Sequence, residues 1–403
     1  MSWFLRMTLF VLPAILAAYA YVGWRIAAAL GQLTSWPRPT IRWSTIAIAG
    51  YLNLYPLLLL ATALLQMTAA NSALRGGRRW LDMLFTFPFW GGLIVVLEVL
   101  PLLLVIDLAR FPLWPLFQKY RPNWMQWQAI ITVSLVAIIV VYVAVRVGHD
   151  TYSVRLTARE VRIPALPADL EGFRIVQLSD LQADPYTDER KMQRYLDLAN
   201  AQKPDLILFA GDLVTRGTGH IAQGANMMGR LRARLGVYAC LGDHDFWVDP
   251  RSIMRHLQGN GVTTIDDSVV TIAASSSRIS LTVITNIYDR RPSASTLEHL
   301  RRRRPEAAVH ILLSHQPTDD IIRFAQNHDY HLLLAGHTHG GQLVFKPFGI
   351  SLCASQIETR YYSGFHQIGN LVLSVTNGLG LTFAPFRYQA PAEVTLITLR
   401  RAR

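Results

Sequence analysis

The sequence predicts an N-terminal bundle of about four transmembrane α-helices, followed by an α/β domain of mixed β-sheets packed together and flanked by helices. Residues 1–149 hold only three acidic residues, whereas the chain from Asp150 onward has the composition of an ordinary globular domain. From residue 173, short apolar runs alternate with helical patterns. We therefore expect two domains, at 1–149 and 150–403.

Four apolar runs stand out in the first domain, near 8–30, 45–68, 84–106 and 127–147. Each reaches the ~20 residues that cross ~30 Å of hydrocarbon as a helix. Tryptophans such as Trp24, Trp36 and Trp43 lie near the ends of the runs, as an aromatic belt would. A soluble bundle of buried helices is the alternative, and four successive runs of this length argue against it. Basic residues divide evenly between the two sets of connections, so they do not choose an orientation.

Glu98 lies inside the third run, in "LIVVLEVLPLLLV". A carboxylate within the membrane is costly and raises a functional question by default. A proton or a hydrogen bond to a neighbouring helix is the structural alternative.

The second domain alternates predicted strands and helices, which favours an α/β fold with largely parallel pairing. Short Val-, Ile- and Leu-rich runs bounded by Gly, Pro or Asp predict buried strands at 173–179, 205–211, 236–242, 310–315 and 330–336. Helical spacing occupies 187–201, 219–233, 251–258, 295–303 and 318–327, residues 263–288 suggest a hairpin, and 368–376 and 393–400 suggest further strands.

Polar residues follow each of the five strands, where α/β sheets place their sites. In order, they are Asp180 with Gln182, Asp212, Asp243-His244-Asp245, His315, and His337 with His339. Singly, Asp180 or Asp212 could be a helix N-cap. Together, carboxylates and imidazoles on one rim would resist desolvation unless cations bind there. Mixed Asp/His ligation suits Mn²⁺, Fe and Zn²⁺, so the sequence predicts a metal site.

The stretch "GHTHGG" at 336–341 has two histidines one residue apart. In an extended segment, alternate side chains point the same way, so His337 and His339 would reach one locus and each could face a different ion. The flanking glycines would allow tight turns and close backbone approach.

These motifs, in this order, resemble the calcineurin-like metallophosphoesterase superfamily, and the C-terminal strands resemble its membrane-anchored bacterial members. The pattern D-x-H, G-D, G-N-H-D/E, H and G-H-x-H appears here as "DLQ" at 180–182, "GD" at 211–212, "GDHD" at 242–245, His315 and "GHTH" at 336–339. The resemblance covers about 172–400.

The resemblance implies a metal-dependent phosphoric ester hydrolase with two divalent ions. One ion would be held by Asp180, Gln182, Asp212 and His339, and the other by Asp212, Asp243, His315 and His337. His244 would contact the phosphate and protonate the leaving oxygen, with Asp245 orienting its imidazole. A metal-bridged hydroxide would cleave a phosphoester or pyrophosphate bond, as in a phosphodiesterase.

Two residues depart from the family pattern. Gln182 stands where the pattern has His, and Asp243 where it has Asn. Both changes make the site richer in oxygen, which favours manganese, or Mg²⁺, over Zn²⁺, with Fe also accepted.

The membrane region favours the lipid bilayer as a partner, a lipid-linked substrate and a multi-pass position in the inner (cell) membrane. Nucleic acid is not expected, because no aromatic residues interleave the basic clusters "RRRR" at 301–304 and "RRAR" at 400–403. Two alternatives stay open: a degenerate metal- or phosphate-binding sensor coupled to the membrane bundle, and a transporter regulated by its soluble domain. The sequence does not choose an oligomeric state or a side of the membrane.

Overall fold

The computed structural model describes residues 3–75, 79–109, 112 and 118–402. It divides into two compact units, each described by itself. The first unit comprises Met1–Gly148 together with the short segment Phe345–Leu352, and the second comprises His149–Val344 and Cys353–Arg403. The short segment was not anticipated, because it lies deep in the sequence of the second domain.

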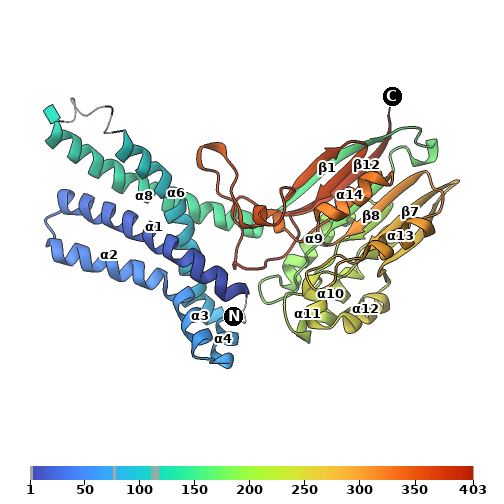
Figure 1. Cartoon of the computed structure of the whole chain (residues 1–403), viewed down its shortest axis with the longest axis horizontal. Helices are drawn as coiled ribbons and strands as arrows, with labels where there is room; N and C mark the ends of the chain where they lie inside the picture. The colour runs from blue at the N-terminus through green and yellow to red at the C-terminus, as the bar shows by residue number, and fades with distance from the viewer. Residues whose placement is uncertain (1–2, 76–78, 110–111, 113–117, 403) are drawn as a thin grey trace. The chain divides into compact units, whose positions relative to one another are not determined.

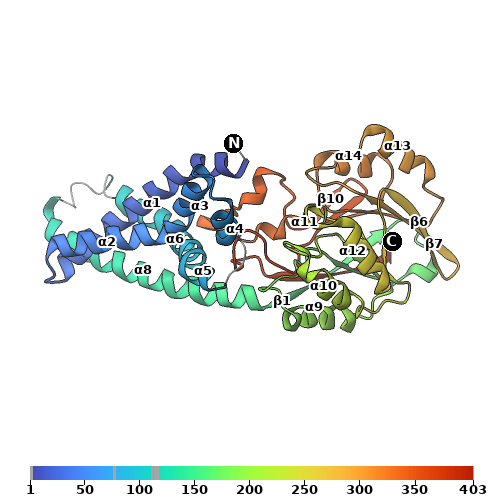
Figure 2. The same cartoon turned by 90° about the horizontal axis from the view of Figure 1, so that it is seen from below.

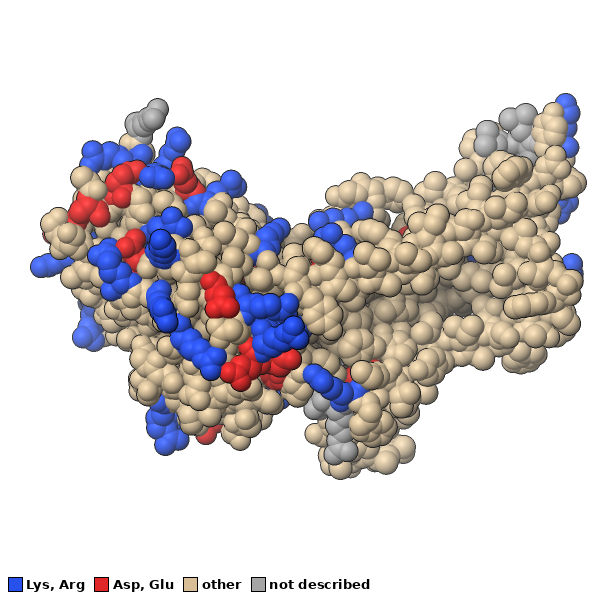
Figure 3. Space-filling model, turned by 180° about the vertical axis from the view of Figure 1, so that it is seen from behind, with Lys and Arg blue, Asp and Glu red and all other residues tan. Residues whose placement is uncertain are grey.

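The first unit is helical. Its elements are α1 (Trp3–Leu33), α2 (Arg38–Leu52), α3 (Leu54–Leu64), α4 (Thr68–Arg75), α5 (Arg79–Leu81), the π-helical turn η1 (Asp82–Thr86), α6 (Phe87–Leu108) and α8 (Arg121–Tyr152). Three helical stretches are long and apolar enough to cross a membrane: Leu9–Leu33, Arg79–Leu108 and Arg121–Tyr152. Figure 3 shows these helices as a surface almost without charged side chains along its length.

The expected span near 45–68 is broken. Helices α2 and α3 meet at Asn53 with a bend of 55°, and only as a bent pair do they make a fourth span. Pro56 lies in the first turn of α3, where it has no N–H to donate and its ring would clash with the carbonyl four residues earlier. The Asn53 side chain donates to the carbonyl of Ala49 at 2.8 Å, which satisfies a group at the break.

Helices α1, α6 and α8 belong to one bundle (Figure 1), and a cluster of polar side chains joins them. Asp107 accepts hydrogen bonds from Tyr21 at 2.7 Å and from Gln128 at 2.8 Å, and the Arg25 guanidinium lies 3.4 Å away. Buried charges are tolerated when they are paired and hydrogen-bonded. The carboxylate with these interhelical partners is therefore Asp107, while Glu98 lies partly buried on α6.

The second unit contains two six-stranded sheets with the orders β1-β12-β2-β3-β4-β5 and β10-β11-β9-β8-β7-β6. The strands of the first sheet are β1 (Val154–Ile163), β2 (Arg174–Leu178), β3 (Leu206–Phe209), β4 (Val237–Ala239), β5 (Val262–Thr264) and β12 (Ala392–Arg401). Those of the second are β6 (Ser268–Ala274), β7 (Ser277–Ile284), β8 (Val309–Ser314), β9 (Leu332–Ala335), β10 (Gly364–Ile368) and β11 (Leu371–Val375).

The two sheets pack face to face and helices cover their outer faces (Figure 2). Helices α9 (Glu189–Ala201), α10 (Ile221–Met228), α11 (Asp243–Val248) and α12 (Pro250–Gly259) belong to the first sheet, and α13 (Ala294–Arg303) and α14 (Asp319–Asn327) to the second. One apolar core lies between the sheets, with Ile175 and Leu208 of the first facing Leu281 and Leu313 of the second. Two further apolar cores are present, and each lies between one sheet and the helices that cover it.

The predicted strands and the hairpin are present, and three strands were missed: β5, which pairs in parallel with β4, β1 and β10. Strand β1 pairs in parallel with β12, and β10 pairs antiparallel with β11. Both lie at sheet edges, and β1 exposes charged residues such as Arg155 and Glu160, so it lacks the continuous apolar pattern of a buried strand.

Parallel pairing decides where the polar residues meet. Strands β2, β3 and β4 are parallel neighbours, as are β8 and β9, so the carboxyl ends within each set share one edge. The sheets bring these two edges together at one rim of the second unit.

Candidate metal centre

The residues that follow these strands adopt an unusual backbone. Asp180, Gln182, Asp212, His337 and His339 have φ values of 52°, 50°, 63°, 71° and 50°. A non-glycine residue in this left-handed region costs roughly 1–2 kcal/mol. Such strain persists where the surrounding structure enforces it, and it clusters at functional sites.

The first group of candidate ligands is Asp243, His315 and His337, whose ligand atoms lie within 4.8 Å of one another. Asp243 Oδ2 is 3.3 Å from His315 Nε2 and 3.0 Å from His337 Nδ1. Strands of both sheets supply this group, because Asp243 follows β4 and the two histidines follow β8 and β9.

The second group is Asp180, Asp212 and His315, again within 4.8 Å. His339 Nε2 lies 3.4 Å from Asp180 Oδ1, and the Gln182 amide nitrogen donates to Asp212 Oδ2 at 2.9 Å. The structure therefore brings all seven sequence-predicted ligands into two adjoining clusters, joined through His315 and Asp212.

The backbone of the "GHTH" stretch differs from the extended segment that the sequence suggested. His337 is left-handed and His339 begins a 3₁₀ turn, His339–Gly341. Left-handed residues turn the chain, so the two imidazoles diverge, His337 toward Asp243 and His339 toward Asp180. Each still faces a different cluster.

Two motif glycines are required by close packing against the carboxylates. A Cβ at Gly242 would lie 2.2 Å from Asp212 Oδ1, and one at Gly336 would lie 1.8 Å from Ser179 Oγ and 2.5 Å from Asp180 Oδ2. Real Cβ atoms do not approach other atoms so closely. A side chain at either position would therefore displace a candidate ligand.

The contacts within the site raise the pKa of a histidine and lower the pKa of a carboxyl group. Burial alone would lower the pKa of His337, but hydrogen bonds to Asp243 and Glu358 raise it to about 9. Burial would likewise raise the pKa of Asp243, yet the imidazoles of His315 and His337 lower it. The buried carboxylates thus stabilise cations within the site.

The donor set fits divalent cations. Within the described residues, Asp180 Oδ1, Gln182 Oε1 and His315 Nε2 are buried and have no hydrogen-bond partner. His315 Nδ1 is 2.6 Å from the carbonyl of Ala210, so Nδ1 donates there and Nε2 is the nitrogen that can face a cation. Burial and the charge of Arg387 lower the pKa of His339, which keeps that imidazole in its neutral, ligating form.

His244 and Asp245, the two residues expected to act in catalysis, are not among the candidate ligands, and they make different contacts. His244 lies in the first turn of α11, where its backbone N–H donates to Asp212 Oδ1 at 2.8 Å, and its Nδ1 is 2.7 Å from the carbonyl of Thr215. Asp245 instead accepts from the backbone N–H groups of Asp212, Leu213 and Gly242 at 2.8–3.0 Å. Thr215, and not Asp245 as expected, orients the imidazole, and Asp245 holds the turn that carries Asp212.

Three residues were missed by the sequence analysis. Glu358 Oε2 is 3.0 Å from His337 Nε2, Tyr288 donates its N–H to Asp243 Oδ1 at 2.7 Å, and buried Arg387 binds loop carbonyls around the site. They follow no strand with a motif, so only their positions in space reveal them.

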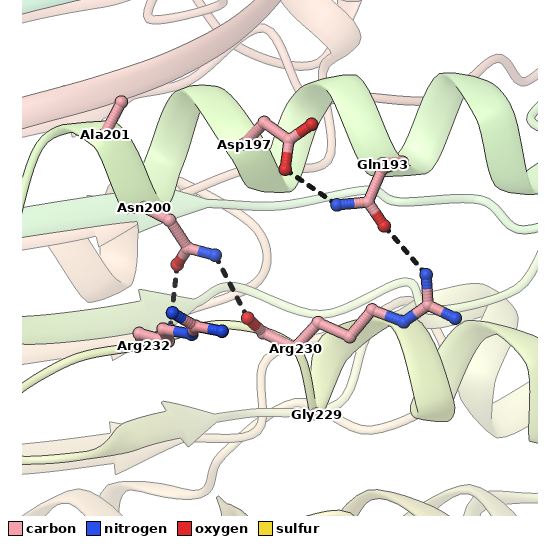
Figure 4. Close-up of a pocket in the computed structure, with 7 residues that line it drawn as sticks. All are labelled: Gln193, Asp197, Asn200, Ala201, Gly229, Arg230 and Arg232. Atoms are coloured by element: carbon pink, nitrogen blue, oxygen red, sulfur yellow. Dashed lines mark hydrogen bonds between the residues drawn. The ribbon is translucent and has the colours of Figure 1, made fainter.

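A separate hollow of about 480 Å³ lies on the surface between α9 and the loop after α10 (Figure 4). Its polar side chains bind one another: Asn200 bonds the Arg230 carbonyl and the Arg232 N–H, and Gln193 bonds Asp197 and Arg230. Because these groups satisfy each other, this hollow differs from the strained, partly unsatisfied metal centre.

Comparison with known proteins agrees with this geometry. The calcineurin-like phosphoesterase family matches residues 173–341. Residues 173–341 form a calcineurin-like phosphoesterase domain. This metallophosphoesterase domain contains every candidate ligand, from Asp180 to His339.

Two curated relatives share much of the chain. "Transmembrane protein with metallophosphoesterase domain" of Danio rerio is 27% identical over 291 residues, which are 68% of this chain and 63% of the relative. "Uncharacterized metallophosphoesterase YkuE" of Bacillus subtilis is 28% identical over 256 residues, 62% of this chain and 87% of the relative. The chain thus spans somewhat under two thirds of the zebrafish protein. Both relatives carry the same kind of domain, and one also carries membrane segments by name.

Proposed function

We propose that the protein is a membrane-embedded hydrolase that cleaves a phosphoester or pyrophosphate bond with two divalent cations. The observation that carries this proposal is the pair of Asp/His groups within 4.8 Å, built from strands of both sheets. Asp180, Gln182, Asp212 and His339 would hold one cation, and Asp212, Asp243, His315 and His337 the other. Bound there, the cations would supply an activated water and neutralise the phosphoryl oxygens.

The role proposed for His244 is to donate a proton to the leaving oxygen. Its Nδ1 donates to the Thr215 carbonyl, which leaves Nε2 as the nitrogen that can face substrate. The backbone N–H of His244 donates to Asp212 Oδ1, so the proposed acid is held next to the proposed bridging carboxylate. Asp245 acts indirectly, through the backbone that carries Asp212.

The donor set supports Mn²⁺ as the first metal to test. Four of the seven proposed ligands offer oxygen: three carboxylates and the Gln182 amide. Oxygen-rich sites suit Mn²⁺ and Mg²⁺, whereas additional imidazole would favour Zn²⁺ or Fe.

A lipid-linked substrate in the inner membrane is the more specific part of the proposal. Within the second unit, Thr151 Oγ1 accepts from the Arg387 N–H at 3.0 Å and the Arg387 guanidinium binds the His339 carbonyl, so the residues that directly follow the last apolar run are held at the loop around the site. Ile357 is 76% exposed and directly precedes Glu358, which contacts His337. Singly exposed apolar residues are common on protein surfaces, so support for a lipid-linked substrate comes from the helices long and apolar enough to cross a membrane.

The test uses full-length protein purified in detergent, loaded with Mn²⁺ and given a chromogenic phosphodiester and a lipid-linked pyrophosphate. We expect His244→Ala to lower kcat by roughly 10²–10⁴-fold while bound metal is retained. Asp212→Asn should lower the bound metal itself. Fully loaded protein that hydrolyses no phosphoester would overturn the proposal.

A sensor is the second candidate, and one observation favours it. The Gln182 amide nitrogen donates to Asp212 Oδ2, an oxygen that the bridging role requires. A site that must rearrange to bind its cations could report phosphate or metal without rapid turnover. In cells, His244→Ala with intact function alongside a null Asp212→Asn would favour the sensor.

A further inference from the structure

Two large aromatic side chains stand exposed beside the metal centre. Trp247 on α11 is 53% exposed and Tyr288, after β7, is 45% exposed. Their rings are parallel within 1°, with centroids 6.3 Å apart. The two rings therefore share one orientation, and both residues are about half exposed to solvent.

Both rings are held in place. Trp247 Nε1 donates to Asp289 Oδ2 at 2.6 Å, and the Tyr288 hydroxyl donates to Glu358. The Tyr288 N–H is fixed on Asp243. A rigid aromatic surface loses little conformational entropy when a ligand binds, which favours recognition.

Each ring of the pair packs against one histidine of the site, either His244 or His337. The Trp247 ring packs edge-on against His244, with centroids 5.0 Å apart, and the Tyr288 ring packs edge-on against His337 at 5.3 Å. His244 would protonate the leaving oxygen. The atoms attached to that oxygen would then extend from His244 toward Trp247.

We propose that Trp247 and Tyr288 form a subsite for a planar aromatic ring carried by the leaving group, such as the base of a nucleoside phosphate. Stacking on aromatic side chains contributes ~1–3 kcal/mol per base and tolerates different bases because each has a flat π-face. A flexible apolar chain has no such face, so the parallel rings favour a ring as occupant. This inference rests on the proposed hydrolase function.

The experiment compares adenosine 5′-diphosphate with ribose 5-diphosphate, which differ only in the base, using full-length Mn²⁺-loaded protein and phosphate release. The wild type should prefer the adenosine compound by roughly 5–150-fold in kcat/KM, the factor that one stacked base supplies. Trp247→Ala should bring this ratio close to one, mainly through KM, and Trp247→Phe should restore part of it. Phe383→Ala is the matched control, since Phe383 is 70% exposed and lies on another loop, and it should keep the wild-type ratio.

The outcomes separate the alternatives. An equal fall for both substrates in Trp247→Ala would mean that Trp247 only positions His244, and an unchanged ratio would mean that no base stacks there. A C15 prenyl diphosphate whose turnover alone depends on Trp247 would show an apolar chain in the subsite; each result overturns the inference. If neither the diphosphates nor the chromogenic phosphodiester is hydrolysed, the proposed function fails. Binding of adenosine 5′-monophosphate against ribose 5-phosphate to wild type and Trp247→Ala then still decides the subsite.

Discussion

Replacing Arg387 by methionine tests whether one buried guanidinium holds the loops of the metal centre together. Arg387 is 1% exposed and donates five hydrogen bonds to backbone carbonyls, those of His339, Asn377, Gly378, Gly380 and Ala390. Burial lowers its pKa only to about 10, so it carries its charge at neutral pH. Methionine fills a similar volume and donates nothing.

The magnitude follows from these bonds. A hydrogen bond to a charged group contributes ~1.5–3 kcal/mol, so five would give at least about 7 kcal/mol if they added. Against this, methionine avoids the cost of burying a charge, several kcal/mol per ion. We expect a net loss of about 3–5 kcal/mol, the range seen when a buried charge network is broken. For a domain of this size that loss lowers Tm by roughly 6–20 °C.

The assay measures thermal unfolding and bound metal in the same samples of full-length protein in detergent. Metal content should fall as well, because a Cβ at Gly378 or Gly380 would touch Asp180 or Gln182, which shows how closely these loop residues pack on the ligands. Arg387→Lys keeps the charge but offers fewer directed donors, so it should give an intermediate Tm. A methionine variant with wild-type Tm and metal content would refute the reasoning.

Two further predictions concern a glycine and a histidine. Gly378→Ala should destabilise by roughly 2–4 kcal/mol and reduce bound metal, because its φ is 65° and the new Cβ would lie 2.7 Å from that of Asp180. Gly364→Ala, with φ 89° and open space around it, should show only the backbone cost and unchanged metal; equal effects in both variants would contradict this. Burial and the charge of Arg304 lower the pKa of His310 to about 4, so it stays neutral when folded and gains a proton on unfolding below ~6.5. Its contribution is therefore present above pH ~6.5 and lost as pH falls toward 4, and His310→Gln should flatten the pH dependence of denaturant unfolding in that window. An identical slope in the variant would disprove this assignment.

The apolar runs and the polar residues after them could be predicted from sequence because both are local signals. Buried strands such as 205–211 require continuous apolar side chains, and helices in a bilayer require long ones. The order of Asp180, Asp212, His315 and His337 along the chain then indicated one rim. Edge strand β1 escaped prediction because an exposed edge imposes no such pattern.

The contacts that tune the site were decided by tertiary structure. The Thr215 carbonyl orients His244, where sequence suggested the neighbouring Asp245. Every residue carries the same carbonyl, so a backbone acceptor leaves no mark in the sequence. Glu358 reaches His337 from 21 residues away, and Trp247 and Tyr288 become parallel only when α11 and the segment after β7 meet.

By itself, the sequence determined a first part with helices apolar enough to span a membrane and a second part with five strands that end in candidate metal ligands. The lengths of the apolar runs and the spacing of the polar residues carry that information, because burial and ligand chemistry restrict which residues can occupy those positions. Only the tertiary structure decided that "GHTH" is turned, that the span near 45–68 bends at Asn53, and that Arg387 ties together the loop after β9 and the loop between β11 and β12. These features depend on which distant backbones approach one another, and packing of the two sheets and their loops sets that distance.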